Sequence, residues 1–229
     1  MQSRRVFITG GTGYIGKRLI PQLHAQDCHV IALAREQSRN KLPRGCTPVT
    51  GDALDGDSYR KFVEGADTFV HLVGVSHPSP AKAKQFREID LRSGLEAIRV
   101  ARQVGIEHFV YVSVAQPAPV MRDYQAVRAE CEQAIAGTGM AATVLRPWYV
   151  LGPEHRWPYS LLPFYKVAEL IPQTRETALR LGLVTIGQMI CALVHAVGHP
   201  AEGVRILGVP EIRSLANRAF YSVKTVVRC

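Results

Sequence analysis

With 229 residues, of which 47% are hydrophobic and 21% charged, the chain has the composition of one packed globular domain, which excludes a disordered or fibrous protein. The net charge of +9 comes from Arg and Lys spread along the chain without a nucleic-acid-binding motif, so we expect a solvated basic surface and no nucleic-acid partner. The five cysteines show neither CxxC spacing nor a cluster with histidines, which predicts reduced thiols, no metal site and a cytoplasmic protein.

A long apolar run, residues 181–198, is interrupted by Gln188 and His195 and has no aromatic or basic anchors beside it. It therefore predicts a buried helix, and we expect no association with a membrane. The opening residues SRRVFI are followed by glycines and basic residues instead of an unbroken apolar segment, so we also expect no export signal.

Short β-rich runs alternate with helical stretches over the first two thirds of the chain. We expect strands at 4–9, 29–34, 46–50, 68–73, 108–114 and 141–146, and helices at 14–26, 57–64, 83–104 and 123–136. Several strands are nearly continuous in Val, Ile, Leu and Phe, which is typical of strands buried on both faces. The pattern predicts an α/β protein with a Rossmann-type, doubly wound parallel sheet.

The alternation weakens after residue 147, where a segment rich in Pro, Gly and aromatic residues begins. It precedes a helix at about 186–198, a short strand at 204–208 and a last helix near 211–219. No flexible linker separates the two parts. We therefore expect one domain over residues 1–229, with a core at about 1–147 and a small lobe over the carboxyl edge of the sheet at about 148–229.

The sequence FITGGTGYIGK ends the first predicted strand and opens the first predicted helix. Gly10, Gly13 and Gly16 are spaced three apart, and Gly11, Gly13 and Gly16 also fit the pattern GxGxxG. Glycines there allow a tight turn and a close backbone approach, and the free amides at a helix start bind a pyrophosphate. The motif predicts a dinucleotide-binding loop formed by Thr9, Gly10, Gly11, Thr12, Gly13, Tyr14, Ile15 and Gly16.

The end of the second strand indicates which dinucleotide binds. An acidic residue there would hold the ribose of NAD, but this chain has Arg35, followed by Ser38 and Arg39. An arginine can pair with the 2'-phosphate of NADP, so we expect NADP(H) to be preferred. Glu36 could instead contact the ribose, which leaves NAD(H) as the alternative.

Two further segments follow later strands of the predicted sheet. Asp52, with Ala53 after it, could bind the adenine amine, although a turn or helix-cap role is equally consistent with its position. Leu72, Val73 and Gly74 close the fourth strand and would let the adenosine and ribose lie against the backbone. His71, inside that apolar strand, is expected to be a core histidine.

These motifs resemble the short-chain dehydrogenase/reductase superfamily. The stretches TGGTGYIG, GDALD, FVHLVG, YVSV and TVLRPWYVLGP occur in the order seen in its extended and atypical branches, over about residues 4–153. The later stretch LVTIGQMICALVHAV is similar to the late helix of the NmrA-like members. The resemblance implies a Rossmann fold and a dinucleotide site. It does not by itself imply catalysis, because this branch includes members that bind NADP(H) without turnover.

In catalytic members of the superfamily, a serine and a tyrosine bind the reacting oxygen, and a lysine four residues after the tyrosine holds the nicotinamide ribose. The resemblance transfers these roles to Ser113, Tyr124 and the position of Arg128, where this chain departs from the lysine. A planar guanidinium need not reproduce the contacts of an ammonium. The alternative is a structural helix surface on which Arg128 pairs with Glu132 four residues later.

An aromatic cluster follows the sixth strand. Ligand sites in open sheets lie at the carboxyl ends of the strands, so this cluster could line a substrate pocket, or it could pack the small lobe. The candidate pocket residues are Trp148, Tyr149, His155 and Trp157.

The residues together predict an NADP(H)-dependent oxidoreductase acting on a small apolar carbonyl or conjugated substrate, as a monomer or homodimer. The alternative is a non-catalytic NADP(H)-binding sensor or assembly protein with a protein partner. A nucleotide-sugar epimerase or isomerase also uses this fold, but 229 residues leave little room for a large sugar-nucleotide lobe.

Overall fold

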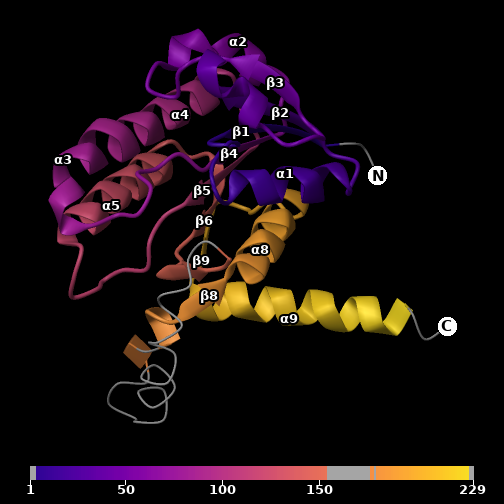
Figure 1. Cartoon of the computed structure of the whole chain (residues 1–229), viewed down its shortest axis with the longest axis vertical. Helices are drawn as coiled ribbons and strands as arrows, with labels where there is room; N and C mark the ends of the chain where they lie inside the picture. The colour runs from indigo at the N-terminus through magenta and orange to yellow at the C-terminus, as the bar shows by residue number, and fades with distance from the viewer. Residues whose placement is uncertain (1–3, 154–175, 178, 227–229) are drawn as a thin grey trace.

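A computed structural model describes residues 4–153, 176–177 and 179–226, with side chains through Asn217. Its main feature is a parallel sheet of seven strands in the order β3-β2-β1-β4-β5-β6-β9 (Figure 1). A second, two-stranded sheet pairs β7 with β8. The parallel, doubly wound sheet confirms the predicted Rossmann-type fold.

The strands of the main sheet are β1 (Arg5–Thr9), β2 (His29–Ala34), β3 (Thr47–Thr50), β4 (Thr68–His71), β5 (His108–Val112), β6 (Ala141–Leu145) and β9 (Val204–Leu207). The small sheet contains β7 (Tyr149–Leu151) and β8 (Leu183–Thr185). The α-helices are α1 (Gly16–His24), α2 (Arg60–Val63), α3 (Ala83–Gln85), α4 (Arg92–Gln103), α5 (Arg122–Gly137), α8 (Ile186–Gly198) and α9 (Val209–Val226). Tighter or wider helical turns lie at Glu36–Lys41, Gly56–Ser58, Pro80–Lys82 and Phe86–Leu91.

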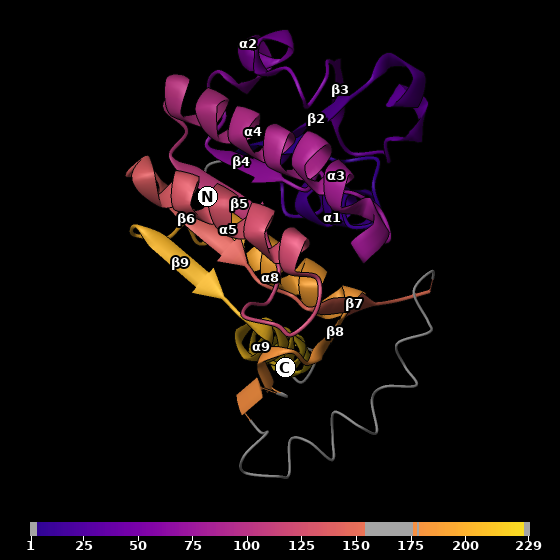
Figure 2. The ribbon, with the colours of Figure 1, turned by 90° about the vertical axis from the view of Figure 1, so that its left-hand side faces the viewer.

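Helices cover both faces of the sheet because successive strand residues point to opposite sides. In β1, Phe7 packs in a core with α4 and α5, whereas Val6 and Ile8 pack in a second core with α1 and α8. Figures 1 and 2 show these two helical layers on either side of the sheet. The nearly continuous apolar strands of the sequence therefore reflect burial on both faces.

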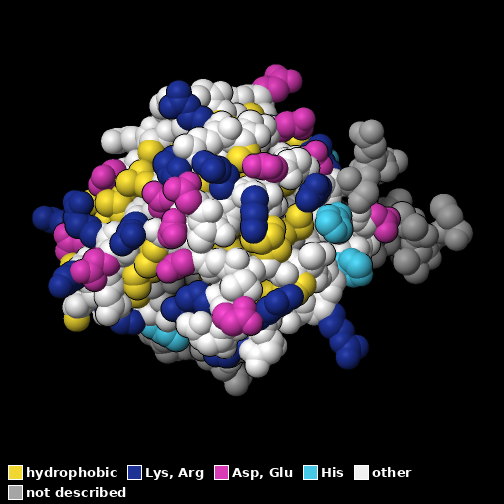
Figure 3. Space-filling view, turned by 90° about the horizontal axis from the view of Figure 1, so that it is seen from above, with side chains coloured by type: hydrophobic (Ala, Val, Ile, Leu, Met, Phe, Trp, Pro, Cys, Tyr) yellow, Lys and Arg dark blue, Asp and Glu magenta, His cyan; other side chains and the backbone are white. Residues whose placement is uncertain are grey.

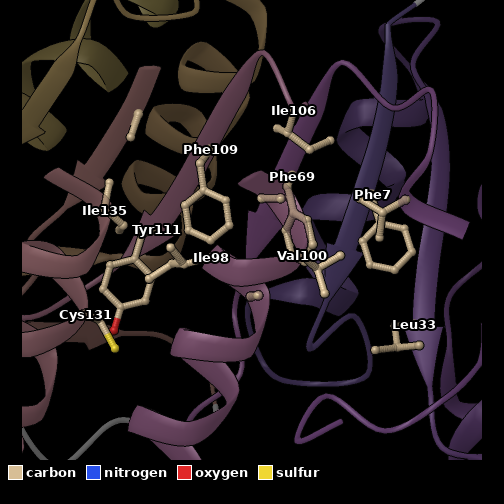
Figure 4. Packing of buried hydrophobic residues seen from close by; sticks show 14 of the residues in the cluster. Phe7, Leu33, Phe69, Ile98, Val100, Ile106, Phe109, Tyr111, Cys131 and Ile135 are labelled. Carbon is tan, nitrogen blue, oxygen red and sulfur yellow. The ribbon is translucent and has the colours of Figure 1, made fainter. Parts of the chain in front are cut away.

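Aromatic side chains form the centre of the core under α4 and α5 (Figure 4). Phe7, Phe69 and Phe109 come from three adjacent strands, and their ring centroids lie 5.1 and 5.3 Å apart. Tyr111 follows on β5, with its hydroxyl toward Cys131 in the view of Figure 4. Burying such large rings stabilises the fold beyond the area they remove from water.

Several elements differ from the sequence-based expectations. The predicted helix at 57–64 is a turn at Gly56–Ser58 followed by the short α2, and the predicted helix at 83–104 contains a π-helical turn, Phe86–Leu91. The last helix is longer than predicted. The pair β7 and β8 was not predicted, because three-residue strands give too short a pattern to recognise.

The carboxyl-terminal part contributes to the main layers of the fold. Helix α8 forms as predicted and is capped by a reciprocal pair of hydrogen bonds between Thr185 and Gln188. It packs against α1, and β9 extends the sheet beside β6. Within the described ranges, no helix is both long enough and apolar enough to span a bilayer.

The charged residues are mixed on the face that Figure 3 shows. Lys and Arg side chains lie there among Asp and Glu side chains, without a continuous basic area. This distribution agrees with the dispersed basic residues of the sequence.

Candidate functional site

The strand order reverses between β1 and β4. From β1 the chain proceeds outward to β2 and β3, and then returns to β4 on the other side of β1. In open α/β sheets, ligands bind at the carboxyl ends of the strands where the order reverses in this way. The glycine-rich loop after β1 and the segment Leu72–Gly74 after β4 meet at this edge.

The glycines of the loop have different structural roles. Gly10 has a left-handed backbone, with φ of +79°, and a Cβ there would lie 2.7 Å from the carbonyl carbon of Leu72. A Cβ on Gly16 would lie 2.5 Å from the carbonyl oxygen of Gly10, so glycine lets α1 approach the loop. Gly13 is exposed, and a Cβ there would meet only the Gly10 oxygen, at 3.2 Å. The loop therefore presents an open backbone surface at the start of α1, as a phosphate site requires.

Other residues of the loop fix its position. Thr9 is fully buried, and its hydroxyl lies 2.8 Å from Nδ1 of His71. The Tyr14 ring stacks on the Arg18 guanidinium, and a Cβ on Gly152 would collide with the Tyr14 hydroxyl. Gly11 is buried, whereas Thr12 and Ile15 are half-buried. The loop is thus held by β4, by α1 and by the chain after β7.

Exposed cations follow β2 at the same edge of the sheet. Arg35 and Arg39 are exposed, and neither forms an ion pair with any residue that the structure describes. Ser38 lies between them in the turn Glu36–Lys41. The Glu36 carboxylate accepts a hydrogen bond of 2.8 Å from the Thr50 hydroxyl at the end of β3.

Asp52 has a local structural role after β3. Its Oδ1 accepts a hydrogen bond of 3.0 Å from the Leu54 amide, and its own amide bonds the Ser58 hydroxyl at 3.0 Å. These contacts are those of a turn. The Asp52 side chain is nevertheless exposed, and Ala53 beside it is half-buried.

Ser113 lies one residue beyond β5 and is 3% exposed. Its hydroxyl donates a hydrogen bond of 2.5 Å to Oε1 of Glu132 on α5. The same carboxylate accepts from Gln116 and pairs with Arg146, which follows β6. Ser113 is thus joined to a charged network, and no hydrogen bond between Ser113 and Tyr124 occurs in the described part of the chain.

Tyr124 and Arg128 lie on one face of α5, as their spacing predicts. The Arg128 guanidinium carbon lies 5.0 Å from the centroid of the Tyr124 ring, which also packs on Phe86. Arg128 is only 4% exposed. It donates to the Tyr111 hydroxyl at 3.2 Å and to the Val112 carbonyl at 3.0 Å. In the alternative interpretation, Arg128 pairs with Glu132; that pairing was wrong, since Arg128 pairs with a different carboxylate.

That carboxylate belongs to Asp90, which is fully buried in the π-helical turn before α4. Its second oxygen accepts a hydrogen bond of 3.0 Å from the Val75 amide. Asp90 was not predicted as a site residue. A signal was present, because Asp90 follows Phe86 by four residues on an otherwise core-facing stripe, and a charge at such a position requires a buried partner.

His71 is a core histidine, as predicted. It is fully buried between Thr9 and Ser93, and its ring stacks on Tyr111 with centroids 5.9 Å apart. Burial lowers the pKa of His71 to about 3, and the charge of Arg128 acts in the same direction. Burial likewise lowers the pKa of His108, on β5, to about 4.

The low pKa values of these two histidines predict that mild acid destabilises the folded protein. In the unfolded chain both histidines bind protons below about pH 6.5, whereas in the folded protein both rings stay neutral. The free energy of unfolding should therefore fall by up to about 1.4 kcal/mol per histidine for each pH unit below about 6.5. Urea unfolding at about pH 7.5, 6.5 and 5.5 measures this slope. In His108→Gln, which retains a partner for Thr143, the slope should be about half that of the wild type. An equal slope in both proteins would show that His108 does not contribute.

A cleft of about 440 Å³ lies at the carboxyl ends of β5, β6 and β9. Most of its lining surface is apolar, from residues such as Ala115, Ile206 and Val209. Charged residues also line it, namely Arg146, Glu176, Arg180 and Glu211. Trp148 and Tyr149 pack edge to face, with centroids 6.4 Å apart, and neither is among the described residues that line the cleft. His155 and Trp157 lie outside the described residues.

The sequence also matches a described protein family. The match to the NAD dependent epimerase/dehydratase family extends over residues 6–203. The chain belongs to this family. Membership agrees with the resemblance to extended and atypical short-chain dehydrogenases/reductases, and the matched residues include the glycine-rich loop, Tyr124 and α8.

Individual relatives of this family member are distant. A 4-hydroxy-2-methyl-3-oxo-4-farnesyl-3,4-dihydroquinoline-1-oxide ketoreductase of Stigmatella aurantiaca is 26% identical over 66% of the chain and 51% of its own length. A ceramide reductase of Caulobacter vibrioides is 23% identical over 87% of the chain and 62% of its own length. The photosystem II assembly factor Ycf39 of Synechocystis is 24% identical over 62% of the chain and 44% of its own length. The chain thus spans between 44% and 62% of the length of these relatives.

Among solved structures, the Bordetella bronchiseptica enzyme WbmH, determined in complex with NAD+, has a TM-score of 0.68 to this chain. The alignment covers 97% of this chain and 82% of WbmH at 19% sequence identity. At that identity the likeness establishes the fold alone.

Proposed function

We propose that this family member is an NADP(H)-dependent oxidoreductase of the atypical short-chain dehydrogenase/reductase type. The observation that carries the proposal is the loop after β1, where Gly10 and Gly16 close the turn and Gly13 stays open at the start of α1. A nicotinamide dinucleotide held there supplies or accepts a hydride. The residues from Thr9 to Gly16 would hold its pyrophosphate, and the segment Leu72–Gly74 would lie beneath a ribose.

The preference for NADP(H) is supported by charge at the end of β2. Arg35 and Arg39 have no carboxylate partner among the described residues, so both can pair with a 2'-phosphate. Glu36 is engaged with Thr50. This hydrogen bond engages one oxygen of the Glu36 carboxylate, which supports the preference for NADP(H) over NAD(H).

Replacing Arg35 by alanine tests this preference. We expect NADPH binding to weaken by about tenfold to a hundredfold and NADH binding by less than about threefold, because only NADPH loses a charge-assisted contact. Fluorescence titration with both nucleotides measures the two Kd values. Arg44→Ala, at another exposed arginine near the same segment, serves as the control. If Arg35→Ala weakened the binding of NADPH and NADH equally, the proposed preference for NADP(H) would be wrong.

The substrate we propose is an apolar carbonyl or conjugated compound. The largely apolar cleft of about 440 Å³ beyond β5 and β6 supports this class. Two of the relatives are named as reductases of a farnesylated quinoline oxide and of a ceramide, both of which carry long hydrocarbon groups. Tyr124 is the proposed proton donor or acceptor, with the Arg128 cation fixed beside its ring and Ser113 assisting from the end of β5.

An assay with NADPH and a panel of hydrophobic ketones tests the activity. If Tyr124 transfers the proton, Tyr124→Phe should lose about a hundredfold in kcat while the Kd for NADPH stays unchanged. Tyr59→Phe, which alters a fully buried tyrosine on the other side of the same core, should leave kcat unchanged. If activity is measurable but equal in Tyr124→Phe and the wild type, Tyr124 is not the proton donor.

A second candidate is a non-catalytic NADP(H)-binding sensor or assembly protein. It is favoured by the engagement of Ser113 with Glu132 and of Arg128 with Asp90, since both side chains are committed to other protein groups. One relative is named as a photosystem II assembly factor. Tight NADPH binding without turnover of any substrate in the panel would favour this function over the first.

A further inference from the structure

The segment Leu72–Val75, which follows β4, lies between two different parts of the structure. On one side is Gly10 of the nucleotide loop, whose Cβ, if present, would lie 2.9 Å from the Val73 amide. On the other side is the ion pair between Asp90 and Arg128, both of which are buried. The proposed cofactor site therefore has a charged pair directly behind one of its backbone walls.

Gly74 shows how closely this pair approaches the segment. A Cβ on Gly74 would lie 2.5 Å from Nη2 of Arg128 and 3.0 Å from Oδ1 of Asp90. The Gly74 backbone is not left-handed, so conformational freedom does not account for the glycine. The contact with the Arg128 guanidinium accounts for it.

The pair also connects the segment to two other elements. Asp90 accepts from the Val75 amide at 3.0 Å, and Arg128 donates to the Val112 carbonyl, at the end of β5, at 3.0 Å. Asp90 lies within the π-helical turn Phe86–Leu91, a feature that re-aims side chains and is frequent at functional sites. The ends of β4 and β5 are thus held together through two buried charges.

We infer that Asp90 is a positioning residue of the cofactor site. It holds the Arg128 guanidinium behind Gly74, and the pair sets the position of the Leu72–Val75 backbone on which the cofactor rests. Arg128 therefore acts on the cofactor through this backbone instead of through a direct contact. The inference rests on the proposed function in that it assigns the Leu72–Val75 segment to nucleotide binding.

A cycle of variants tests the inference through Gly74. In the wild-type background, Gly74→Ala should lower the Tm by about 5–10 °C and weaken NADPH binding by at least about tenfold, because its methyl group displaces the Arg128 guanidinium. In the neutral background Asp90→Asn/Arg128→Met, the same methyl group has no guanidinium to displace. The fall in Tm caused by Gly74→Ala should then be about a third or less of its value in the wild-type background. The change in log Kd for NADPH should be reduced to about the same fraction. Arg128→Lys, which has no atom at the Nη2 position, provides a second background.

Glu130→Gln provides the matched control. Glu130 on α5 pairs with Arg87 of the same π-helical turn at 3.8 Å, but at the surface of the protein. Gly74→Ala should therefore have its full effect in the Glu130→Gln background. If Glu130→Gln reduced the effects of Gly74→Ala as much as the neutral background does, the inference would be overturned.

The outcomes separate this inference from the proposed function. Equal losses from Gly74→Ala in the wild-type and neutral backgrounds, or no loss in the wild-type background, would overturn the inference. Coupling in Tm without coupling in the Kd for NADPH would also overturn it, because the pair would then stabilise the fold without shaping the site. A wild-type protein that binds no nicotinamide nucleotide would refute the proposed function and the cofactor role of Asp90. The Tm cycle would still show whether the pair fixes Gly74.

Discussion

Replacing Arg128 by methionine is expected to lower the free energy of unfolding by about 3–5 kcal/mol, because Asp90 would be buried without its counter-charge and would have to take up a proton to fold. For a chain of this length the Tm should fall by roughly 10 °C or more. Burial raises the pKa of the Asp90 carboxyl, and Arg128 is the largest influence that opposes this rise. Urea unfolding of the variant and the wild type measures the difference.

The loss in Arg128→Met should depend on pH in a defined direction. Without Arg128, Asp90 is expected to fold in its protonated form, so its pKa in the folded state lies further above its unfolded value near 3.9. Folding then costs more free energy as the pH rises above that unfolded value. The difference between the variant and the wild type should therefore be larger at about pH 8 than at about pH 5. A difference that shrinks as the pH rises would contradict this assignment.

Arg87→Met is the matched control for Arg128→Met. Arg87 also connects the π-helical turn to α5, through Glu130, but its side chain is 68% exposed. Exposed pairs of this kind contribute about 0–1 kcal/mol, so Arg87→Met should be close to the wild type. Similar losses in the two variants would show that burial of the Asp90–Arg128 pair is not what makes it important.

Gly13→Asp is expected to weaken NADP(H) binding by about a thousandfold, since it places a negative charge at the proposed pyrophosphate site. The fold should tolerate the change. Gly13 is exposed and does not require a left-handed backbone, and a Cβ there would have only the Gly10 oxygen within 4 Å, at 3.2 Å. Titration with NADPH and a melting curve measure the two properties on the same sample.

The control for Gly13→Asp is Gly137→Asp, which adds the same charge at the end of α5. No atom lies within 4 Å of a Cβ at Gly137, so this variant should bind NADPH as the wild type does. If Gly13→Asp binds NADPH within about threefold of the wild type while Gly137→Asp is also normal, the glycine-rich loop is not the pyrophosphate site.

The choice between a catalytic protein and a sensor depends on the contacts that Tyr124, Arg128 and Ser113 make in the structure. The sequence places all three at positions that match a catalytic pattern. In the structure, Arg128 contacts the Tyr124 ring, but its hydrogen bonds are made to Asp90, Tyr111 and Val112. A protein that binds NADP(H) and turns over no substrate would agree with this arrangement, as would a reductase in which Tyr124 alone transfers the proton.

The sequence alone determined the features that depend on local patterns. The alternation of apolar strands with helices predicted the parallel sheet, because each strand must be covered on both faces. The spacing of Gly10, Gly13 and Gly16 after a strand predicted the loop, because a tight turn and a close helix approach require glycine. The burial of His71 followed from its position within an apolar strand.

Only the tertiary structure decided the features that depend on contacts between distant residues. The partner of Arg128 could not be predicted from its helix, because Asp90 is 38 residues away and is aimed inward by a π-helical turn. The requirement for Gly74 had the same origin, since an unstrained backbone gives no local reason for glycine. Spacing along the chain specifies which side chains share a helix face. Which charge lies opposite a buried side chain is determined only when separate elements pack together, because burial makes an unpaired charge too costly.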